Sequence, residues 1–280
     1  MSTDTPRAYP EGVPCWIQLD VADTAAASVF YRELFGWSYV DAVPNDPGLY
    51  LFARLDGGEG EGVGDAGAIS RSDDQPSWVS FIACDDIEAT CAAVERAGGL
   101  VAVPPDEGSP FGRSATITDP LGAVFQLWQA GTHPGSQVVN VPGAWNFSDL
   151  HTPDADASMR FYGEVFGWRV DPQLGAGMVR LPGYGDHLEA TIDPDIRTRQ
   201  EFAPEGFEDV IAGLTVDEDA ERAEWIMRFT VADRDASAAE VERLGGTVIS
   251  RTETDWVKEA TVRDPAGATL VLSELAPPED

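Results

Sequence analysis

Lysine, cysteine and long apolar runs are scarce in this sequence. Lys258 is its only lysine, and 18 lysine and arginine residues stand against 49 aspartates and glutamates, so the formal net charge over 280 residues is −31. A surface of this sign repels phosphate backbones and anionic lipids, which disfavours nucleic-acid-binding and membrane-surface functions. Surface acidity with few lysines fits a salt-adapted or high-GC host better than a dedicated acidic docking face.

Several function classes lack their sequence signals. No apolar run approaches the roughly 20 residues of a membrane-spanning helix, and the N-terminus lacks the regions of a signal peptide. Cys15, Cys84 and Cys91 form no CxxC pair, so we expect buried, reduced thiols. The motifs GxSxG, GKS/T and HExxH are absent. The sequence therefore predicts a cytoplasmic protein whose partner is a small molecule, with no nucleic acid and no membrane.

One eight-residue segment occurs twice. Residues 30–37 read FYRELFGW and residues 161–168 read FYGEVFGW, with six identities at an offset of 131. An aspartate lies seven residues before the first phenylalanine of each copy, at Asp23 and Asp154. A duplication of this length indicates a tandem repeat.

Further landmarks divide each copy into two units. Gly98-Gly99 has its counterpart in Gly245-Gly246, and the turn Asp119-Pro-Leu-Gly122 has its counterpart in Asp264-Pro-Ala-Gly267. Side-chain alternation, helix caps and glycines between these landmarks predict four β-α-β-β-β units. The expected domains are 1–130 and 144–280, joined by a Gly/Pro-rich linker over 131–143. Residues 193–209 have no counterpart in the first half and are expected to be an inserted loop.

These landmarks resemble the vicinal oxygen chelate superfamily, which holds glyoxalase I, bleomycin-resistance proteins and extradiol dioxygenases. The match spans 14–130 and 142–276. The duplicated arrangement is most similar to two-domain glyoxalase-like proteins of actinobacteria, of the mycobacterial culture-filtrate antigen type, some of which are labelled hydroxylases. The resemblance implies an α+β fold of tandem glyoxalase-like domains. Each domain would pair two β-α-β-β-β units into a curved, mostly antiparallel sheet around a cup, with helices outside.

The resemblance also assigns a role to each side of the first strand. Ile17, Leu19 and Val21 would pack under the first helix, whereas the alternate side chains of the same strand would line the cup. The residues implied to bind a ligand are Trp16, Gln18, Asp20, Gln126, Trp128 and Phe147. Their aromatic rings suit stacking on a planar ligand, or they fill the cups as core.

The family's usual metal site is not favoured by these residues. Metal-dependent members place His or Gln on the first strand of a unit and Glu on the closing strand, and these positions correspond to Trp16, Phe147, Gln126 and Val271. Three of the four offer no useful lone pair to a divalent ion. We therefore expect no metal site and no cofactor.

His151 and Asp149 form the one constellation with the chemistry of a catalytic pair. They lie two residues apart on a predicted strand and point the same way. They could act as a base with its orienting carboxylate, or ligate a metal with a third donor from elsewhere. Alternatively, His151 forms a hydrogen bond with nearby backbone at the end of the strand. His133 and His187 are expected to face solvent, in the linker and in a polar loop.

Two functional hypotheses follow. The first is a glyoxalase/bleomycin-resistance-like protein that binds a small organic molecule in an aromatic-lined cup without the usual metal. The alternative is an enzyme, a glyoxalase-like lyase or an oxygenase/hydroxylase of a secondary metabolite, that uses His151 and Asp149. A protein with both cups plugged is a third reading. The sequence leaves open the ligand, the number of open cups, and whether the chain is a monomer or a homodimer.

Overall fold

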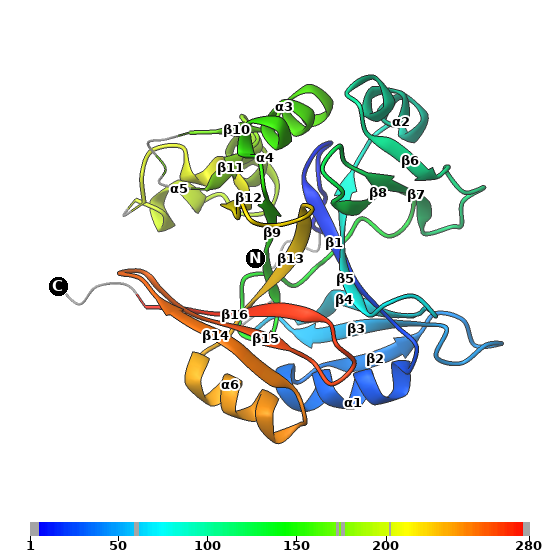
Figure 1. Cartoon of the computed structure of the whole chain (residues 1–280), viewed down its shortest axis with the longest axis vertical. Coiled ribbons are helices and arrows are strands. Elements are labelled where there is room, and N and C mark those ends of the chain that lie inside the picture. Colours follow the sequence, from blue (N-terminus) through cyan, green and yellow to red (C-terminus); the bar gives the residue numbers. More distant parts are fainter. Residues whose placement is uncertain (1–5, 59–61, 172–173, 175–176, 202, 277–280) are drawn as a thin grey trace. The chain divides into compact units, whose positions relative to one another are not determined.

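The protein folds into two open, curved, mostly antiparallel sheets of eight strands each, and helices connect some of the strands along the chain (Figure 1). The structure is a computed structural model and describes residues 6–58, 62–171, 174, 177–201 and 203–276. The two sheets follow the two halves of the repeat, and the predicted fold of tandem β-α-β-β-β units is confirmed.

The first sheet has the strand order β2-β3-β4-β1-β5-β8-β7-β6. The first and last strands of each unit pair in parallel, β1 with β4 and β5 with β8. A parallel pair needs a long crossover connection, and the helix after the first strand is part of it. The elements of this half are β1 (Pro14–Val21), α1 (Thr24–Phe35), β2 (Ser38–Asp41), β3 (Tyr50–Asp56), β4 (Val63–Arg71), β5 (Ser77–Ala83), α2 (Ile87–Arg96), β6 (Leu100–Val103), β7 (Gly112–Thr118) and β8 (Val124–Ala130).

The second sheet repeats this order as β10-β11-β12-β9-β13-β16-β15-β14. Its elements are β9 (Trp145–Thr152), α3 (Ala155–Phe166), β10 (Arg169–Val170), β11 (Met178–Arg180), α4 (Tyr184–Thr191), α5 (Ile196–Arg199), the 3₁₀ turn η2 (Phe207–Asp209), β12 (Val210–Val216), β13 (Glu224–Thr230), α6 (Arg234–Arg243), β14 (Thr247–Glu253), β15 (Val257–Arg263) and β16 (Thr269–Leu275).

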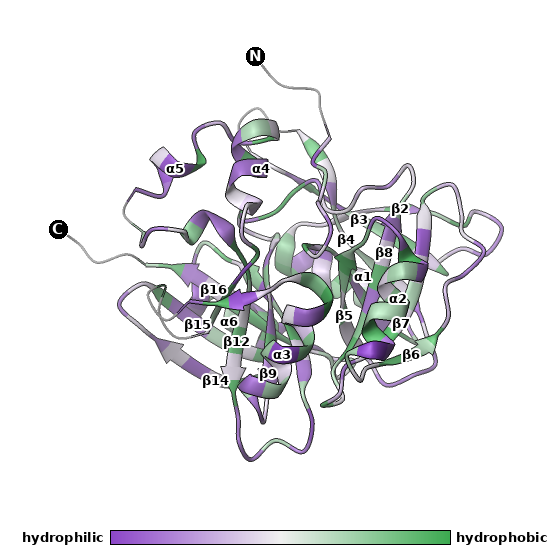
Figure 2. Cartoon of the chain, turned by 90° about the horizontal axis from the view of Figure 1, so that it is seen from above, coloured by the Kyte–Doolittle hydropathy of each residue, from purple (hydrophilic) through white to green (hydrophobic). Residues whose placement is uncertain are grey.

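The duplicated helices begin directly after the two aspartates and end at the glycines of the repeated segment. The side chains of Asp23 and Asp154 accept a hydrogen bond from the backbone N–H three residues on, which satisfies a donor at the helix start. Gly36 and Gly167 end the helices at φ 76° and 75°, in the left-handed region that a side chain disfavours. The apolar stripes of the helices can be followed by colour in Figure 2.

The inserted segment differs from the expected loop. It contains α5 and η2, and the preceding polar stretch forms α4, so His187 lies in a helix. His187 is half-buried and its Nε2 lies 3.1 Å from the Ala8 carbonyl oxygen. Helix α4 follows Gly183 and lacks a side-chain N-cap, so the usual start signal is missing from the sequence.

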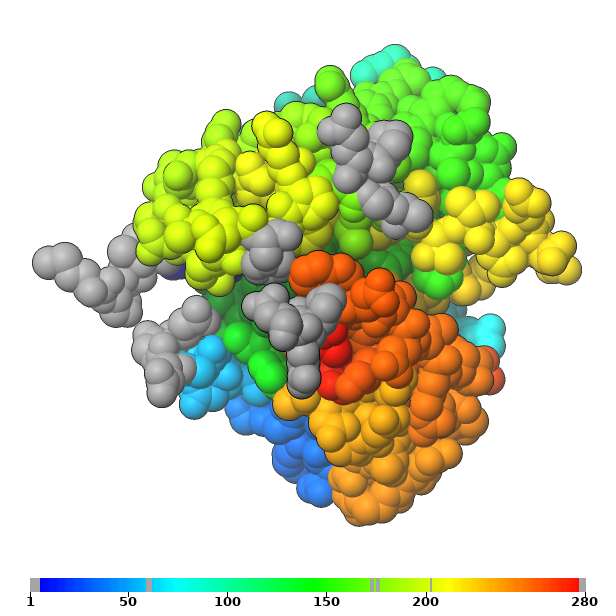
Figure 3. Space-filling model, turned by 90° about the vertical axis from the view of Figure 1, so that its left-hand side faces the viewer, coloured from blue at the N-terminus to red at the C-terminus, as the bar shows by residue number. Residues whose placement is uncertain are grey.

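The chain packs into two compact units, each of which takes one β-α-β-β-β unit from either half of the repeat. Unit 1 comprises Met1–Cys15, Ser80–Gly135 and Ser148–Trp225. Unit 2 comprises Trp16–Val79, Ser136–Phe147 and Ile226–Asp280. In unit 2, Glu33 of α1 and Arg243 of α6 form an ion pair at 3.5 Å, and Figure 3 shows blue and orange atoms from the two ends of the sequence side by side.

In unit 2 a buried hydrogen-bond relay connects the two repeat landmarks. The Tyr31 hydroxyl donates to the Asp264 carboxylate at 2.8 Å and accepts from the indole N–H of Trp78 at 3.3 Å. The same carboxylate accepts three backbone N–H groups of its own turn. The FYxxxFGW helix of one half is thus tied to the Asp-Pro-x-Gly turn of the other.

Unit 1 contains the same relay built from the other copies of the landmarks. The Tyr162 hydroxyl donates to Asp119 at 3.1 Å and accepts from the Trp225 indole at 3.2 Å. Tyr162 also stacks on Trp168 with ring centroids 4.9 Å apart. Both motifs that reveal the repeat in the sequence therefore serve packing within the units.

Candidate ligand-binding faces

The β1–β4 face in unit 2 is formed by Trp16, Gln18, Asp20, Tyr50 and Phe52. Strand register places Gln18 in line with Ala68 and Phe52, and Asp20 in line with Ser70 and Tyr50, so these side chains share one side of the sheet. The alternate residues Ile17, Leu19 and Val21 are at most 2% exposed. The predicted division of this strand into a core side and a second side is confirmed.

Three aromatic rings cluster on the β1–β4 face. The Trp16 indole N–H donates to the Tyr50 hydroxyl at 3.1 Å. Phe52 meets Trp16 edge-on at 6.0 Å and Tyr50 at 5.3 Å between centroids. Burial raises the pKa of Tyr50, so it remains a neutral phenol. Trp16 is only 3% exposed, whereas Tyr50 and Phe52 are half-buried.

A carboxylate and an amide lie on the same face. The Gln18 amide donates to Asp20 Oδ1 at 2.5 Å. Burial raises the pKa of Asp20, the Gln18 hydrogen bond opposes this shift, and the negative charge of Asp74 adds to it. The ionised form of a partly desolvated carboxylate is stabilised by a ligand that donates a hydrogen bond or carries a positive charge.

In unit 1, Gln126 and Trp128 lie on the face formed by β5, β7 and β8. Gln126 Nε2 donates to the Thr116 hydroxyl at 2.9 Å, and the Trp128 indole donates to the His133 carbonyl at 2.9 Å. Phe81 meets Trp128 edge-on at 6.2 Å. His133, expected to face solvent, is half-buried because its ring packs against Trp128.

The second-half residues Phe147, Asp149 and His151 share one side of β9. Phe147 and His151 are half-buried, and Asp149 is 3% exposed. Asp149 is in register with Gly213 of β12. A Cβ built on Gly213 would lie 2.7 Å from the Asp149 Cγ, so the absence of a side chain there makes room for the carboxylate.

Replacing Gly213 by alanine should therefore displace Asp149 and lower the free energy of unfolding by about 1–3 kcal/mol, as for other overpacked sites. Urea denaturation measures the effect. In an Asp149→Ala background the same substitution should cost much less, because the two sites are coupled through one contact. An equal cost in both backgrounds would contradict this packing.

Some residues of these faces were not found by sequence reasoning. Tyr50 and Phe52 lie on a strand that the sequence predicts, and strand alternation alone could have placed them. Arg228 and Glu259, which pair on the face formed by β13, β15 and β16, had no such signal.

The residues at the four family ligand positions do not fit a divalent ion. Trp16, Phe147 and Val271 offer no lone pair, which leaves the side-chain oxygen of Gln126 as the one donor among these four positions. Among the described residues, no group of three or more His, Cys, Asp or Glu lies close enough to hold a metal ion.

Comparisons with known proteins agree on one family. The model of the "Glyoxalase/Bleomycin resistance protein/Dioxygenase superfamily" matches residues 16–127, and that of the "Glyoxalase-like domain" matches residues 147–273. The "Putative glyoxylase CFP32" of Mycobacterium bovis is 31% identical over 274 residues, covering 96% of this chain and 97% of the relative. The "Anthracycline biosynthesis protein DnrV" of Streptomyces peucetius is 30% identical over 285 residues, covering 95% and 94%.

Solved structures share the fold at lower identity. The Mn(II)-bound glyoxalase from Novosphingobium aromaticivorans is 16% identical with a TM-score of 0.57, covering 94% of this chain and 82% of that one. The 2,3-dioxygenase LapB from Pseudomonas sp. KL28 is 13% identical with a TM-score of 0.59, covering 95% and 93%. No helix within the described ranges is long and apolar enough to cross a membrane.

Proposed function

The chain belongs to the glyoxalase/bleomycin resistance protein/dioxygenase superfamily, and from this premise we propose that its β1–β4 face binds a small planar organic molecule without the superfamily's metal ion. The observation that carries the proposal is the contact of the Trp16 indole with Tyr50 and Phe52, at the strand position where the family resemblance implies a metal ligand. Aromatic rings beside a few polar groups are the usual lining of small-molecule sites.

The polar groups of the face indicate which ligand would be preferred. Tyr50 and Phe52 offer ring surface, and Asp20 offers a carboxylate whose pKa is raised by burial. A flat ring system that carries a hydroxyl or ammonium group would stack on the rings and donate to Asp20. Gln126, Trp128 and Phe147 remain predicted ligand-binding residues on their own faces.

The names of two relatives supply a candidate ligand class. DnrV and the DauV protein of Streptomyces sp. strain C5, 29% identical over 285 residues, are both named anthracycline biosynthesis proteins. Anthracyclines contain a flat fused-ring system with hydroxyl groups and an amino sugar. We therefore propose an aromatic secondary metabolite of this kind as the ligand.

Titration with an anthracycline tests the proposal. Stacking on the face should quench the ligand's fluorescence saturably, and the affinity should be unchanged after treatment with EDTA. Elemental analysis of the purified protein should find far less than one equivalent of Mn, Fe, Ni or Zn per domain. A full equivalent of metal, or binding that EDTA abolishes, would defeat the metal-free proposal.

The alternative is an enzyme that uses His151 and Asp149. It is supported by the position of a buried carboxylate two residues before a half-exposed imidazole on one side of β9. A methylglyoxal–glutathione assay, with His151→Ala as the test variant, distinguishes the two functions. We expect no His151-dependent turnover and unchanged anthracycline binding; turnover lost on substitution would favour the enzyme.

A further inference from the structure

A second polar cluster lies in unit 2 on the face formed by β13, β15 and β16. The Arg228 guanidinium forms an ion pair with Glu259, and the Ser273 hydroxyl lies 3.4 Å from Glu259 Oε1. Register places Thr230, Ser273 and Glu259 side by side across the three strands. Thr230, Ser273, Glu259 and Arg228 are called the β13–β16 cluster below. The side chains of Arg228 and Glu259 are 23% and 19% exposed, so the pair is largely desolvated and still reachable.

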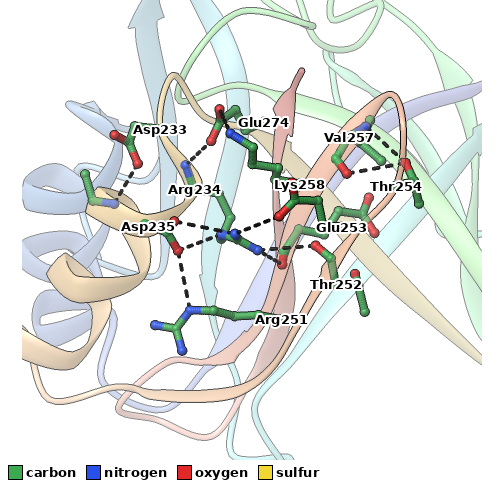
Figure 4. A network of polar contacts seen from close by, with 12 residues as sticks. Asp233, Arg234, Asp235, Arg251, Thr252, Glu253, Thr254, Val257, Lys258 and Glu274 are labelled. Carbon is green, nitrogen blue, oxygen red and sulfur yellow. Dashed lines mark hydrogen bonds and ion pairs between the residues drawn. The ribbon is translucent and has the colours of Figure 1, made fainter. Parts of the chain in front are cut away.

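The backbone that carries Glu259 is held in place from behind. Arg234 of α6 is 6% exposed and donates to the carbonyl oxygens of Thr252 and Glu259 at 3.2 and 2.9 Å. Figure 4 shows Arg234 between Asp235, Thr252 and Glu274, reaching from the helix to the strands. The backbone at Glu259 is therefore anchored to α6, while Arg228 and Ser273 contact its carboxylate.

The fold itself does not require this cluster. In the first half of the repeat, the positions of Arg228, Ser273 and Glu259 are occupied by Phe81, Trp128 and Ser114. The same strands there pack with an edge-on aromatic pair. Burying an ion pair is costly, and apolar replacements of similar size are often neutral or stabilising, so the pair is weak evidence of a stabilising role.

One atom of the cluster is left without a hydrogen bond. Thr230 Oγ1 is buried and has no partner within the part of the chain that the structure describes. Buried hydroxyls are rarely left unpaired, because the lost hydration is not replaced by another hydrogen bond. A bound molecule with its own hydroxyl group would supply the missing partner.

We propose that the β13–β16 cluster is a binding subsite for a neutral, polyhydroxylated small molecule such as a cyclic polyol or a sugar ring. Adjacent hydroxyls can donate to Glu259 and accept from Arg228, and a further hydroxyl can bond Thr230. The ligand is neutral because the guanidinium charge is already compensated by Glu259, which would repel an anion. This subsite stands independently of the β1–β4 face.

The experiment uses the full chain and a panel of probes. The neutral probes are myo-inositol and simple monosaccharides, and the anionic probes are acetate and succinate, screened by saturation-transfer NMR and quantified by calorimetry. At least one neutral probe should bind saturably in the millimolar range. The double variant Arg228→Met/Glu259→Leu should weaken that binding at least tenfold, because it removes both charges together and leaves neither charge unpaired.

A matched control and a milder variant complete the test. Arg243→Met/Glu240→Leu removes an exposed ion pair of the same unit and should leave binding unchanged. If the double variant fails to fold, Thr230→Val takes its place. This substitution keeps the shape of the side chain and should weaken binding severalfold. Asp20→Asn should have no effect, which separates this subsite from the proposed function. The proposal is overturned if no neutral probe binds, if succinate binds in preference, or if these cluster variants bind like the wild type.

Discussion

Replacing Asp119 by alanine should lower the free energy of unfolding by about 3 kcal/mol or more. The Asp119 carboxylate is 4% exposed and accepts hydrogen bonds from the backbone N–H groups of Leu121 and Ala123, each at 2.9 Å, and from the Tyr162 hydroxyl at 3.1 Å. Alanine would leave all three donors without a partner in a buried turn, at about 1–3 kcal/mol each, partly offset by water. Few single substitutions outside a core cost as much.

Asp119→Asn is the matched comparison. Burial raises the pKa of Asp119, so the carboxylate itself carries a desolvation cost that an amide avoids. The asparagine oxygen can accept the two backbone hydrogen bonds and its NH₂ group can donate to the Tyr162 oxygen, so only the Tyr162 hydroxyl hydrogen loses its acceptor. We expect a loss of about 1 kcal/mol or less, measured with the alanine variant by urea denaturation. Equal losses for the two variants would show that the hydrogen bonds are not what the side chain contributes.

Asp20→Asn should raise stability at neutral pH while it weakens ligand binding. Burial raises the pKa of Asp20 above its ordinary value near 4. The folded state therefore holds the proton more tightly than the unfolded state, and stability from this group is full below the ordinary value and is lost as pH rises through the folded pKa. The variant should match the wild type in acid and exceed it at pH 7. Thermal unfolding between pH 4 and 8 measures this difference.

The same variant tests the carboxylate as a ligand partner. Loss of a charge-assisted hydrogen bond costs about 1.5–3 kcal/mol, which corresponds to roughly 10- to 100-fold weaker binding of the anthracycline. Asp73→Asn, at an exposed position in the loop after β4, removes the same charge and should alter neither affinity nor the pH profile. A variant at Asp20 that is less stable at pH 7, or that binds as tightly as the wild type, would remove Asp20 from the proposed site.

Local chemistry made much of the fold predictable. Asp23 and Asp154 cap their helices and Gly36 ends one in a left-handed conformation, and these effects depend only on neighbouring residues. The alternation along β1 placed Ile17 in the core and Gln18 on the other side for the same reason.

Features that depend on distant partners were not predictable. The pairing of Arg228 with Glu259 requires the register of three strands, and the role of Tyr31 as a donor to Asp264 joins residues 233 positions apart. Helix α4 escaped prediction because Gly183 starts it without a side-chain cap. The duplicated motifs identified the repeat but gave no indication that each compact unit draws on both halves.

The composition of the units bears on how the protein folds during synthesis. Unit 1 is incomplete until the ribosome has passed Trp225, and unit 2 requires the segment from Ile226 onward. Strands β1 to β4 therefore lack their packing partners from the last segment of unit 2 while most of the polypeptide is made. Nascent chains in this condition expose apolar surface, which chaperones bind until the segment from Ile226 onward has emerged.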